Sequence, residues 1–489
     1  MIAALILVPF IAGLITFAIK SDRTRRAILI SAASLHTLLT LALFVRRPVP
    51  APNAIFGLDA LGLLFLCLTS LLFLAATVYA NAYLKSESRG LKRDTEEDLF
   101  YQDASQALFT GCLLLFLSTM TLVTMSLHFG VLWVAMEATT LCSAPLIYFH
   151  RHHRSLEATW KYLIICSVGI ALALLGNLFL SVSATRAEES LLLSRLLSAG
   201  RALDTVWLKA AFLFLLVGYG TKMGLAPLHT WLPDAHSEAP SLVSALLSGA
   251  LLNCAFLAIL RIHQVCVASG LADFSQELFI VFGIVSLFFA AFFILGQTDY
   301  KRLLAYSSVE HMGLLALGVG IGGAGAFGAM LHAVNHSFTK AALFFASGNI
   351  LSAYRTKSVA GVRGLSNTLP ATGLLWMAGF FSITGTPPFG TFMSEFTIFK
   401  AAIDDGRFAI AAAGLGALAV IFIGMAKIFL SMTQGVPETG LEPERARESR
   451  SRVVPALLML AGVLLLGLHV PQPLSDVLDA AAKLLEAAP

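Results

Sequence analysis

The sequence predicts an all-α membrane protein with about fourteen transmembrane helices. Of its 489 residues, 57% are hydrophobic and 13% are charged, whereas soluble domains carry about twice that charged fraction. Apolar runs of membrane-spanning length recur along the chain, and backbone exposed to lipid must be helical unless it closes into a barrel of shorter, alternating strands. The expected spans are 2–19, 27–45, 58–83, 106–125, 128–149, 160–184, 206–232, 240–262, 275–296, 302–320, 323–352, 369–400, 409–433 and 452–470.

Lysine and arginine residues indicate how these spans are oriented. The loops after the odd-numbered spans hold about 20 of them, against about 10 in the other loops and the C-terminal end. Examples are KSDRTRR at 20–26, KSESRGLKR at 85–93 and ERARESRSR at 444–452. Because basic loops stay on the cytoplasmic side, we expect a multi-pass protein of a bacterial cytoplasmic (inner) membrane with both termini in the periplasm.

Two of the expected spans are long and interrupted. The seventh breaks at KMGLAP and the twelfth at TGTPPFG. Because the breaks lie five spans apart, spans 4–8 and 9–13 are expected to form two five-helix repeats, the second inverted. Paired broken helices in inverted repeats indicate an ion path near the bilayer midplane. The expected domains are 1–105 (spans 1–3), 106–262 (first repeat and half-channel), 275–433 (second repeat and half-channel) and 434–489 (a loop and span 14).

Ionisable residues inside the expected spans are candidates for function, because a charge in hydrocarbon costs about 3 kcal/mol or more unless it is paired or hydrated. Glu137 lies near the middle of the fifth span, Lys222 well inside the seventh and Lys340 within the eleventh. Glu395 follows the break in the twelfth span. The simpler alternative is a structural ion pair, or a side chain that reaches the headgroups.

The eleventh span carries the sharpest spacing. In LHAVNHSFTKAALF, the residues His332, His336 and Lys340 stand at i, i+4 and i+8, so one helix face holds three protonatable groups over about 12 Å. This pattern favours a proton relay. Two histidines at i and i+4 can also chelate a metal, but no Cys, Asp or Glu accompanies them in this segment. The six cysteines form no C-x-x-C pair, so we expect no metal, no other cofactor and no catalytic residue.

The expected relay needs pairs of groups that exchange protons. A buried lysine holds or releases its proton according to whether a carboxylate is near. We therefore expect Glu137 to control Lys222, and the histidines of the eleventh span to pass protons through Lys340 to Glu395. Further possible members are Lys161, His229, Ser248, Asn253, Glu310 and His311.

Four stretches resemble the antiporter-like, proton-translocating membrane proteins of respiratory complex I, of Mrp antiporters and of group 4 hydrogenases. They are GTKMGLAPLHTWLPDAHSEAPS, TDYKRLLAYSSVEHMG, HAVNHSFTKAALFFASG and TGTPPFGTFMSEF. Within this family, SSVEHMG and SALLSGALLNCAF are most similar to the F-type component of hydrogenase-4. The resemblance covers nearly the whole chain and implies a fourteen-helix core with one proton channel made of two half-channels. By position it implies pathway roles for Glu137, Lys222, His332, His336, Lys340 and Glu395.

One position departs from this family. Many relatives carry a lysine or histidine in the eighth span that links the half-channels, whereas SGALLNCAFLAILR offers Ser248 and Asn253. Neither side chain can carry a charge. The link would therefore need water, or Glu310 and His311 from the tenth span.

The leading hypothesis is a proton-translocating subunit of a translocase, without electron-transfer chemistry of its own. Its partners would be other membrane subunits, the lipid bilayer and a peripheral redox arm that oxidises hydrogen, formate, CO or a reduced nucleotide, with protons or sodium ions as cargo. The alternative is an Mrp-type cation/proton antiporter or ion-coupled uptake subunit without a redox partner. A quinone-binding subunit and a structural spacer are further alternatives. The net charge of +4 gives no sign of nucleic-acid binding.

Overall fold

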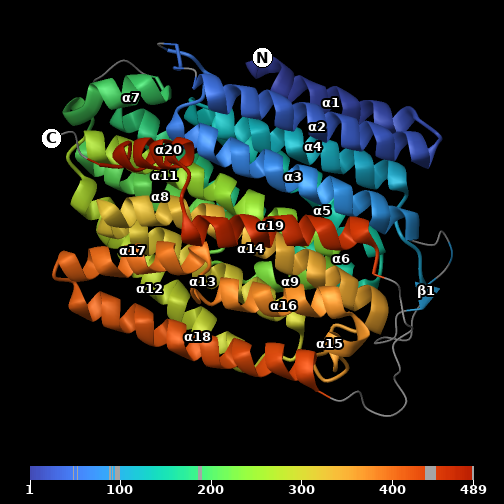
Figure 1. Cartoon of the computed structure of the whole chain (residues 1–489). Helices are drawn as coiled ribbons and strands as arrows, with labels where there is room; N and C mark the ends of the chain where they lie inside the picture. Colours follow the sequence, from blue (N-terminus) through green and yellow to red (C-terminus); the bar gives the residue numbers. More distant parts are fainter. Residues whose placement is uncertain are drawn as a thin grey trace.

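The computed structural model is a bundle of helices that run side by side along one common direction (Figure 1). It describes residues 1–486 apart from 48, 52, 87–89, 91, 94–99, 185–189 and 436–447. The basic segments KSESRGLKR and ERARESRSR, which contribute to the expected orientation, lie partly outside the described residues. The end of the bundle that carries strand β1 (Lys92–Arg93) is called the β1 end, and the opposite end, with helix α7 (Leu193–Ala199), is called the α7 end.

Helices account for nearly all of the described structure, and the one sheet among the described residues is a short antiparallel pair of β1 and β2 (Phe100–Tyr101). The other elements, in chain order, are α1 (Ile2–Ala18), α2 (Asp22–Arg46), α3 (Ala60–Ser86), α4 (Gln106–Met125), α5 (Phe129–Ile147), η1 (Tyr148–His150), α6 (His153–Ser183), η2 (Gly200–Ala202), α8 (Thr205–Met223), α9 (Leu232–Glu238), α10 (Ser241–Leu246), η3 (Leu247–Leu251), α11 (Leu252–Ala268), α12 (Ala272–Ile294), α13 (Tyr300–Ile321), α14 (Ala324–Tyr354), α15 (Leu365–Thr368), α16 (Pro370–Ile383), α17 (Gly390–Asp404), α18 (Phe408–Gln434), α19 (Arg450–Leu468) and α20 (Gln472–Lys483).

Eleven helical segments of the described chain are long and apolar enough to cross a membrane. They are α2, α3, α4, α5 with η1, α6, α8, the continuous segment from α10 to α11, α12, α13, α18 and α19. The helices α1 and α16 are apolar but shorter, and α14, with 31 residues, covers the expected eleventh span. The prediction of an all-α membrane protein is confirmed.

Both predicted helix breaks are present. Residues 224–231 separate α8 from α9, and residues 384–389 separate α16 from α17. Gly224 (φ 85°) and Gly385 (φ 59°) each turn the chain in the left-handed region, which glycine adopts without a steric penalty. The prolines that follow cannot donate the backbone hydrogen bond that a continuing helix needs. Two interrupted helices therefore lie within an otherwise regular bundle.

Some elements differ from the expectation. The short helices α7, α15 and α20 lie outside the expected spans. In α20 the side chains Val477, Leu478 and Ala481 are buried on one face, but the helix is too short and too polar to be found by a search for apolar spans. Helix α6 begins at His153 rather than near residue 160, because it continues beyond the apolar segment into a basic one.

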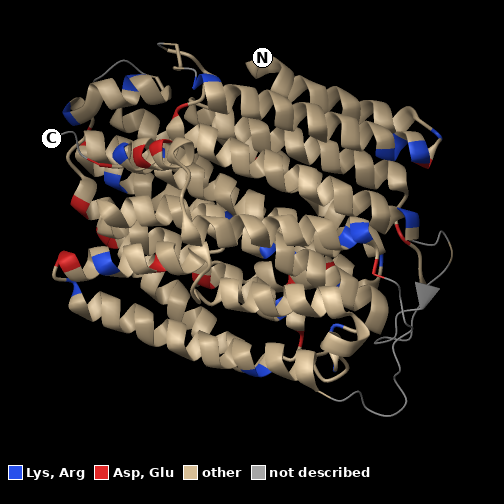
Figure 2. Cartoon of the chain, viewed as in Figure 1, with Lys and Arg blue, Asp and Glu red and all other residues tan. Residues whose placement is uncertain are grey.

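The outer surface of the bundle is apolar along its length. Charged side chains gather at the two ends, and few lie between them (Figure 2). Large apolar side chains are exposed on the outer helices, among them Leu38 (65% exposed), Phe292 (75%) and Ile423 (65%). Such an extended apolar surface fits lipid rather than water. The few charged groups inside the bundle therefore require individual explanation.

A buried ion pair connects α11 to the start of α3. The Arg261 side chain is 2% exposed, and its guanidinium donates to both carboxylate oxygens of Asp59. Burial alone would raise the pKa of Asp59, but the charge of Arg261 and the hydrogen bonds to the carboxylate lower it overall. The pair therefore stabilises the fold at neutral pH, and this stabilisation is lost as the pH falls through the pKa of Asp59 in the folded state.

The substitution Asp59→Asn is expected to lower the free energy of unfolding. Removing one partner of a buried ion pair costs about 3–5 kcal/mol. Because the Asp59 side chain keeps 18% exposure, we expect the low end, about 3 kcal/mol. Thermal unfolding of the purified chain in detergent measures the change. The matched control is Asp476→Asn, which removes an exposed pair with Arg47 and is expected to change the unfolding temperature little; equal shifts would contradict the proposed contribution.

Candidate functional site

Lys222 lies in the last turn of α8, directly before the first break, and its side chain is fully buried. Its ammonium group donates a hydrogen bond to the backbone carbonyl of Met136 at 2.7 Å and a second to the hydroxyl of Thr140, both on α5. A buried ammonium without such acceptors would be strongly unfavourable. The carbonyl end of a helix also favours a cation, so this position suits a protonated lysine.

Glu137, also on α5, is joined to Lys222 through a hydroxyl. Thr140 donates to Glu137 Oε2 at 3.2 Å and accepts from the Lys222 ammonium. Ser167 on α6 donates to the other carboxylate oxygen of Glu137 at 3.4 Å. The contact between the two charged groups therefore runs through Thr140, whereas the sequence suggested a lysine–carboxylate pair alone.

Two aromatic residues connect this first cluster to α9. The Tyr162 hydroxyl on α6 is 2.7 Å from that of Ser143 on α5, and the ring of Tyr162 packs against Trp231 with centroids 4.9 Å apart. Trp231 Nε1 donates to the backbone carbonyl of Thr221 at 2.8 Å and so bridges the break. Tyr162 and Trp231 are not recognisable as members of this cluster from the sequence, because an aromatic residue in an apolar segment is usually a packing residue.

Lys340 forms the second cluster, at the contact of α14 with α13. It is fully buried, and its ammonium donates to the backbone carbonyl of Leu304 and to the hydroxyl of Ser307. Glu310, one turn further along α13, is 1% exposed and interacts electrostatically with Lys340. Its Oε2 atom has no hydrogen-bond partner among the described residues. This carboxyl group is therefore placed to accept a proton.

Three buried histidines lie next to this lysine. His311 Nδ1 on α13 and His332 Nε2 on α14 are 2.8 Å apart, a hydrogen-bond distance. The rings of His311 and His336 have centroids 5.0 Å apart. The second nitrogen of His332 is 2.9 Å from the hydroxyl of Ser394 on α17. His311, only a possible member from sequence, therefore lies at the centre of the cluster.

Glu395 on α17 lies at the far end of this row. Its carboxylate and the ligating nitrogens of His311 and His332 all lie within 4.8 Å of one another. Two of the histidines therefore lie beside Glu395, and the predicted order, in which protons pass through Lys340 before Glu395, stays a prediction. Spacing along α14 gives the order of protonatable groups on that helix. It does not indicate where His311 of α13 and Glu395 of α17 lie relative to them.

The same three residues could in principle hold a metal ion. The segment that contains His332 and His336 has no acidic residue, and Glu395 reaches the histidines from α17. Two imidazole nitrogens bound to one tetrahedral zinc ion at about 2.0–2.1 Å would lie about 3.3 Å apart. The nitrogens of His311 and His332 are 2.8 Å apart. This separation suits a shared proton better than a shared metal.

The eighth span carries uncharged groups between the two clusters. The hydroxyls of Ser248 and Ser308 are 2.8 Å apart, and Asn253 Nδ2 donates to Ser337 Oγ at 2.7 Å. Ser248 lies in η3, a widened π-helical turn of a kind that is frequent at functional sites. These hydroxyl and amide groups can orient protons but cannot hold an extra one.

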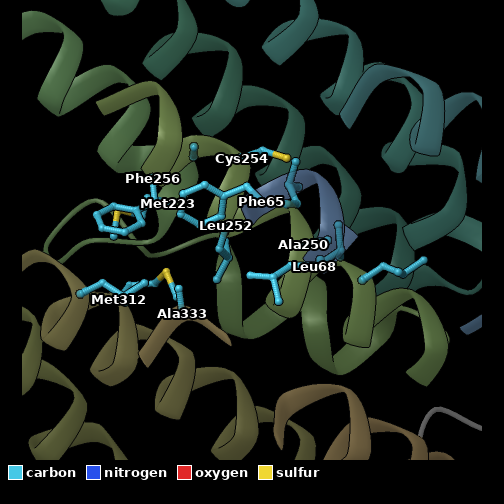
Figure 3. Close-up of a cluster of buried hydrophobic side chains, with 14 of the residues drawn as sticks. Phe65, Leu68, Met223, Ala250, Leu252, Cys254, Phe256, Met312 and Ala333 are labelled. Atoms are coloured by element: carbon cyan, nitrogen blue, oxygen red, sulfur yellow. The ribbon is translucent and has the colours of Figure 1, made fainter. Parts of the chain in front are cut away.

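Apolar side chains fill much of the same region. Figure 3 shows Met223, which follows Lys222, in a cluster with Leu252 of α11, Met312 of α13 and Ala333 of α14. All of these side chains are buried. The packing next to Lys222 is therefore apolar and includes side chains from the helices that carry the histidines.

The remaining two candidates lie near the β1 end. Lys161 on α6 has a side chain 44% exposed, and it forms ion pairs with Glu157 at 2.7 Å and with Asp234 of α9 at 2.9 Å. His229, in the first break, is 4% exposed and packs against aromatic rings including that of Tyr306, 6.1 Å away. The structure places neither of them in the two buried clusters.

Comparison with known proteins adds to this geometry. Residues 126–421 match the family described as NADH:quinone oxidoreductase/Mrp antiporter, TM. The chain is 36% identical over 454 residues to the hydrogenase-4 component F homolog of Methylacidiphilum infernorum (isolate V4), covering 91% of this chain and 92% of that protein.

Two solved structures have the same fold. A chain of the membrane-bound sulfane sulfur reductase, an archaeal respiratory membrane complex, has a TM-score of 0.86 at 22% identity, covering 99% of this chain and 98% of its own. A chain of the Mrp complex from Dietzia sp. DQ12-45-1b has a TM-score of 0.84 at 21% identity, covering 99% and 97%. With the family match and the hydrogenase-4 relative, the chain belongs to the NADH:quinone oxidoreductase/Mrp antiporter family, as an antiporter-like membrane subunit of the kind found in complex I and group 4 hydrogenases.

Proposed function

We propose that this chain moves protons across the membrane through two buried clusters of protonatable side chains. The observation that carries the proposal is the row formed by Lys340, Glu310, the three histidines and Glu395. These groups come from three helices. His311 and His332 lie at hydrogen-bond distance and within 4.8 Å of Glu395, the ring of His336 is 5.0 Å from that of His311, and Glu310 interacts electrostatically with Lys340. Ionisable groups inside a membrane bundle are rare and mark ion pathways. Charged residues kept only for stability would more often form closed ion pairs.

The proposed architecture has fourteen spans. These are the eleven long apolar segments and three further spans, which are α1, α14 and the broken pair of α16 and α17. Residues 1–105 hold the first three spans, 106–262 and 275–433 form two inverted five-helix repeats, and 434–489 hold the last span. The two breaks support this division, because each falls in the fourth span of its repeat. The basic loops support a bacterial inner membrane with both termini in the periplasm.

In the proposed mechanism the first cluster loads and releases protons at Lys222. Its neutral acceptors, a carbonyl and a hydroxyl, stabilise the ammonium without the strong attraction of a carboxylate in direct contact. Lys222 keeps its proton while the Thr140 oxygen accepts a hydrogen bond from the ammonium group. Glu137 strengthens this hydrogen bond, because it accepts the proton of the same hydroxyl. A change at Glu137 therefore alters the tendency of Lys222 to give up a proton.

The energy for pumping is proposed to come from redox chemistry in partner subunits. The similarity to a hydrogenase-4 component F homolog supports a membrane-bound respiratory complex of the group 4 hydrogenase or complex I type. The six cysteines are free and no pair of them stands in a C-x-x-C motif, so we assign electron transfer to the partners. The alternative, an Mrp-type antiporter without a redox partner, is supported by the shared family and by fold similarity at 21% identity. It carries less weight than the 36% identity to the hydrogenase-4 relative.

The substitution Lys222→Ala is expected to uncouple proton pumping from electron transfer. Without the ammonium the first cluster has no group that carries a proton next to the break, and each 1.4 kcal/mol added to a barrier slows a step about tenfold. We expect proton uptake per electron to fall at least about tenfold. Dye quenching in inverted membrane vesicles, normalised to electron transfer, measures this ratio.

The control for that experiment is Lys209→Ala. Lys209 lies on the same helix, but it is exposed and sits over the ring of Phe274. We expect normal pumping from this variant. Normal pumping from Lys222→Ala would exclude the proposed path, and sodium-dependent transport without any electron donor would favour the antiporter alternative.

The substitution Gly385→Ala is expected to impair the far end of the row. An added Cβ would lie 2.0 Å from Glu395 Oε2, and the positive φ of this position disfavours any residue with a side chain. The carboxylate must therefore leave its present position beside His311 and His332. We expect the pumping ratio to fall several-fold while the protein still assembles, because one left-handed residue costs only about 1–2 kcal/mol.

Gly416→Ala is the control for this variant. Gly416 lies within α18, and an added Cβ there would meet no atom within 4 Å. Wild-type pumping from both variants would contradict a role for the position of Glu395.

A further inference from the structure

The two clusters need a connection that the eighth span does not supply with a protonatable group. Ser248 and Asn253 are uncharged and are hydrogen-bonded to neighbouring helices. The neighbouring space holds the apolar cluster of Met223, Leu252 and Met312 (Figure 3). Because these apolar side chains cannot carry a proton, the link between the two clusters has to come from another residue or from water.

His236 lies on α9 and is fully buried. Neither of its ring nitrogens has a hydrogen-bond partner among the described residues. The backbone of Ser244 interacts with the ring but falls short of hydrogen-bond geometry. A buried polar atom left without a partner costs about 1–3 kcal/mol, and ordered water is the usual partner in such positions. The site therefore calls for water at both nitrogens.

On one side His236 faces the second cluster. Its ring stacks on Phe344 of α14, with centroids 5.4 Å apart, and Phe344 lies one turn beyond Lys340. His236 interacts electrostatically with Lys340 and with His336. The buried Lys301 of α13 is the other charged group that acts on it. A change in the charge of His236 would therefore act electrostatically on Lys340 and His336.

On the other side His236 faces the first cluster. Its ring lies parallel to that of Trp231, with centroids 6.4 Å apart. Trp231 packs on Tyr162, whose hydroxyl is bonded to Ser143 on the helix of Glu137. Trp231 also holds the carbonyl of Thr221, the residue before Lys222. His236 thus packs against Trp231, which contacts the first cluster, and against Phe344, which lies next to Lys340 in the second.

We propose that His236, with water at its two ring nitrogens, is the protonatable residue that carries protons between the Lys222 cluster and the Lys340 cluster. An imidazole suits this step because it accepts a proton at one nitrogen and releases another from the second nitrogen, so nothing else is consumed. The role takes the place of the charged residue that is missing from the eighth span. The inference rests on the proposed proton path and adds one residue to it.

The test compares His236→Gln with His263→Gln in inverted membrane vesicles that contain the assembled complex. Glutamine keeps hydrogen-bonding groups but cannot carry a proton. His263 is also fully buried, but it is bonded to Ser275 on α12 and lies away from both clusters. We expect the pumping ratio of His236→Gln to fall at least about tenfold, and that of His263→Gln to stay near wild type.

A second readout separates proton transfer from a structural role. In His236→Gly, added imidazole can occupy the space of the lost ring, and we expect it to restore pumping in a dose-dependent way. Added imidazole should have no such effect on His236→Gln, in which the side chain still fills the space. His236→Asn serves as a further non-protonatable variant, so that the result is read on whichever variant assembles.

The outcomes distinguish this inference from the proposed function. Wild-type pumping in His236→Gln or His236→Asn, together with lost pumping in Lys222→Ala, would overturn the role of His236 and leave the proton path in place. Wild-type pumping in all of these variants would overturn the path itself. Lost pumping in His236→Gly without any imidazole rescue would assign His236 a structural role and would also overturn the inference.

Discussion

The fold depends on how it holds two ammonium groups inside a bundle that is otherwise apolar. Lys222 and Lys340 are both fully buried, and each donates to one backbone carbonyl and to one hydroxyl on the adjacent helix, α5 in the first case and α13 in the second. Neutral acceptors satisfy the donors without the large attraction of a carboxylate in direct contact. This arrangement suits the proposed loading and release of a proton at each lysine. The two sites therefore solve the same physical problem in the same manner.

The broken helices follow from this requirement. The break after α8 ends the helix at Lys222, where the carbonyl end of the helix favours a cation. The break before α17 brings the backbone of Gly385 so close to Glu395 that a Cβ would overlap its carboxylate. Irregular backbone at this depth needs neighbouring helices or a cavity to satisfy its polar groups. Most of the first break is buried, with Leu225, Ala226 and Trp231 fully enclosed, whereas Pro387 and Pro388 in the second break are exposed in the isolated chain. The interruptions thus shape the surroundings of the charged groups they accompany.

Much of this arrangement is predictable from the sequence, because charges within apolar segments are costly and conspicuous. The positions of Lys222 and Lys340 and both helix breaks follow from hydropathy, glycine and proline alone. The neighbours of these residues do not, since the carbonyls and hydroxyls that hold the lysines belong to other helices. The closeness of Glu395 to His311 and His332 is not predictable for the same reason, since the three residues come from three helices. His236 is missed because it stands in the polar stretch PDAHSEAP, where a histidine is unremarkable, and only the fold encloses it.

Helix α9 is held by contacts to both α6 and α13. Lys301 of α13 donates to the backbone carbonyls of Ser237 and Ala239 at 2.8 and 2.6 Å, which fixes the end of α9 to α13. Asp234 of α9 forms ion pairs with Lys161 of α6 and Arg302 of α13, both at 2.9 Å. A shift of α13 relative to α6 must therefore either move α9 or break one of these contacts. Because His236 is part of the same short helix, such a shift would also change the distance between its ring and each cluster. The helix that connects α6 to α13 would therefore also be able to open or close the proposed proton route.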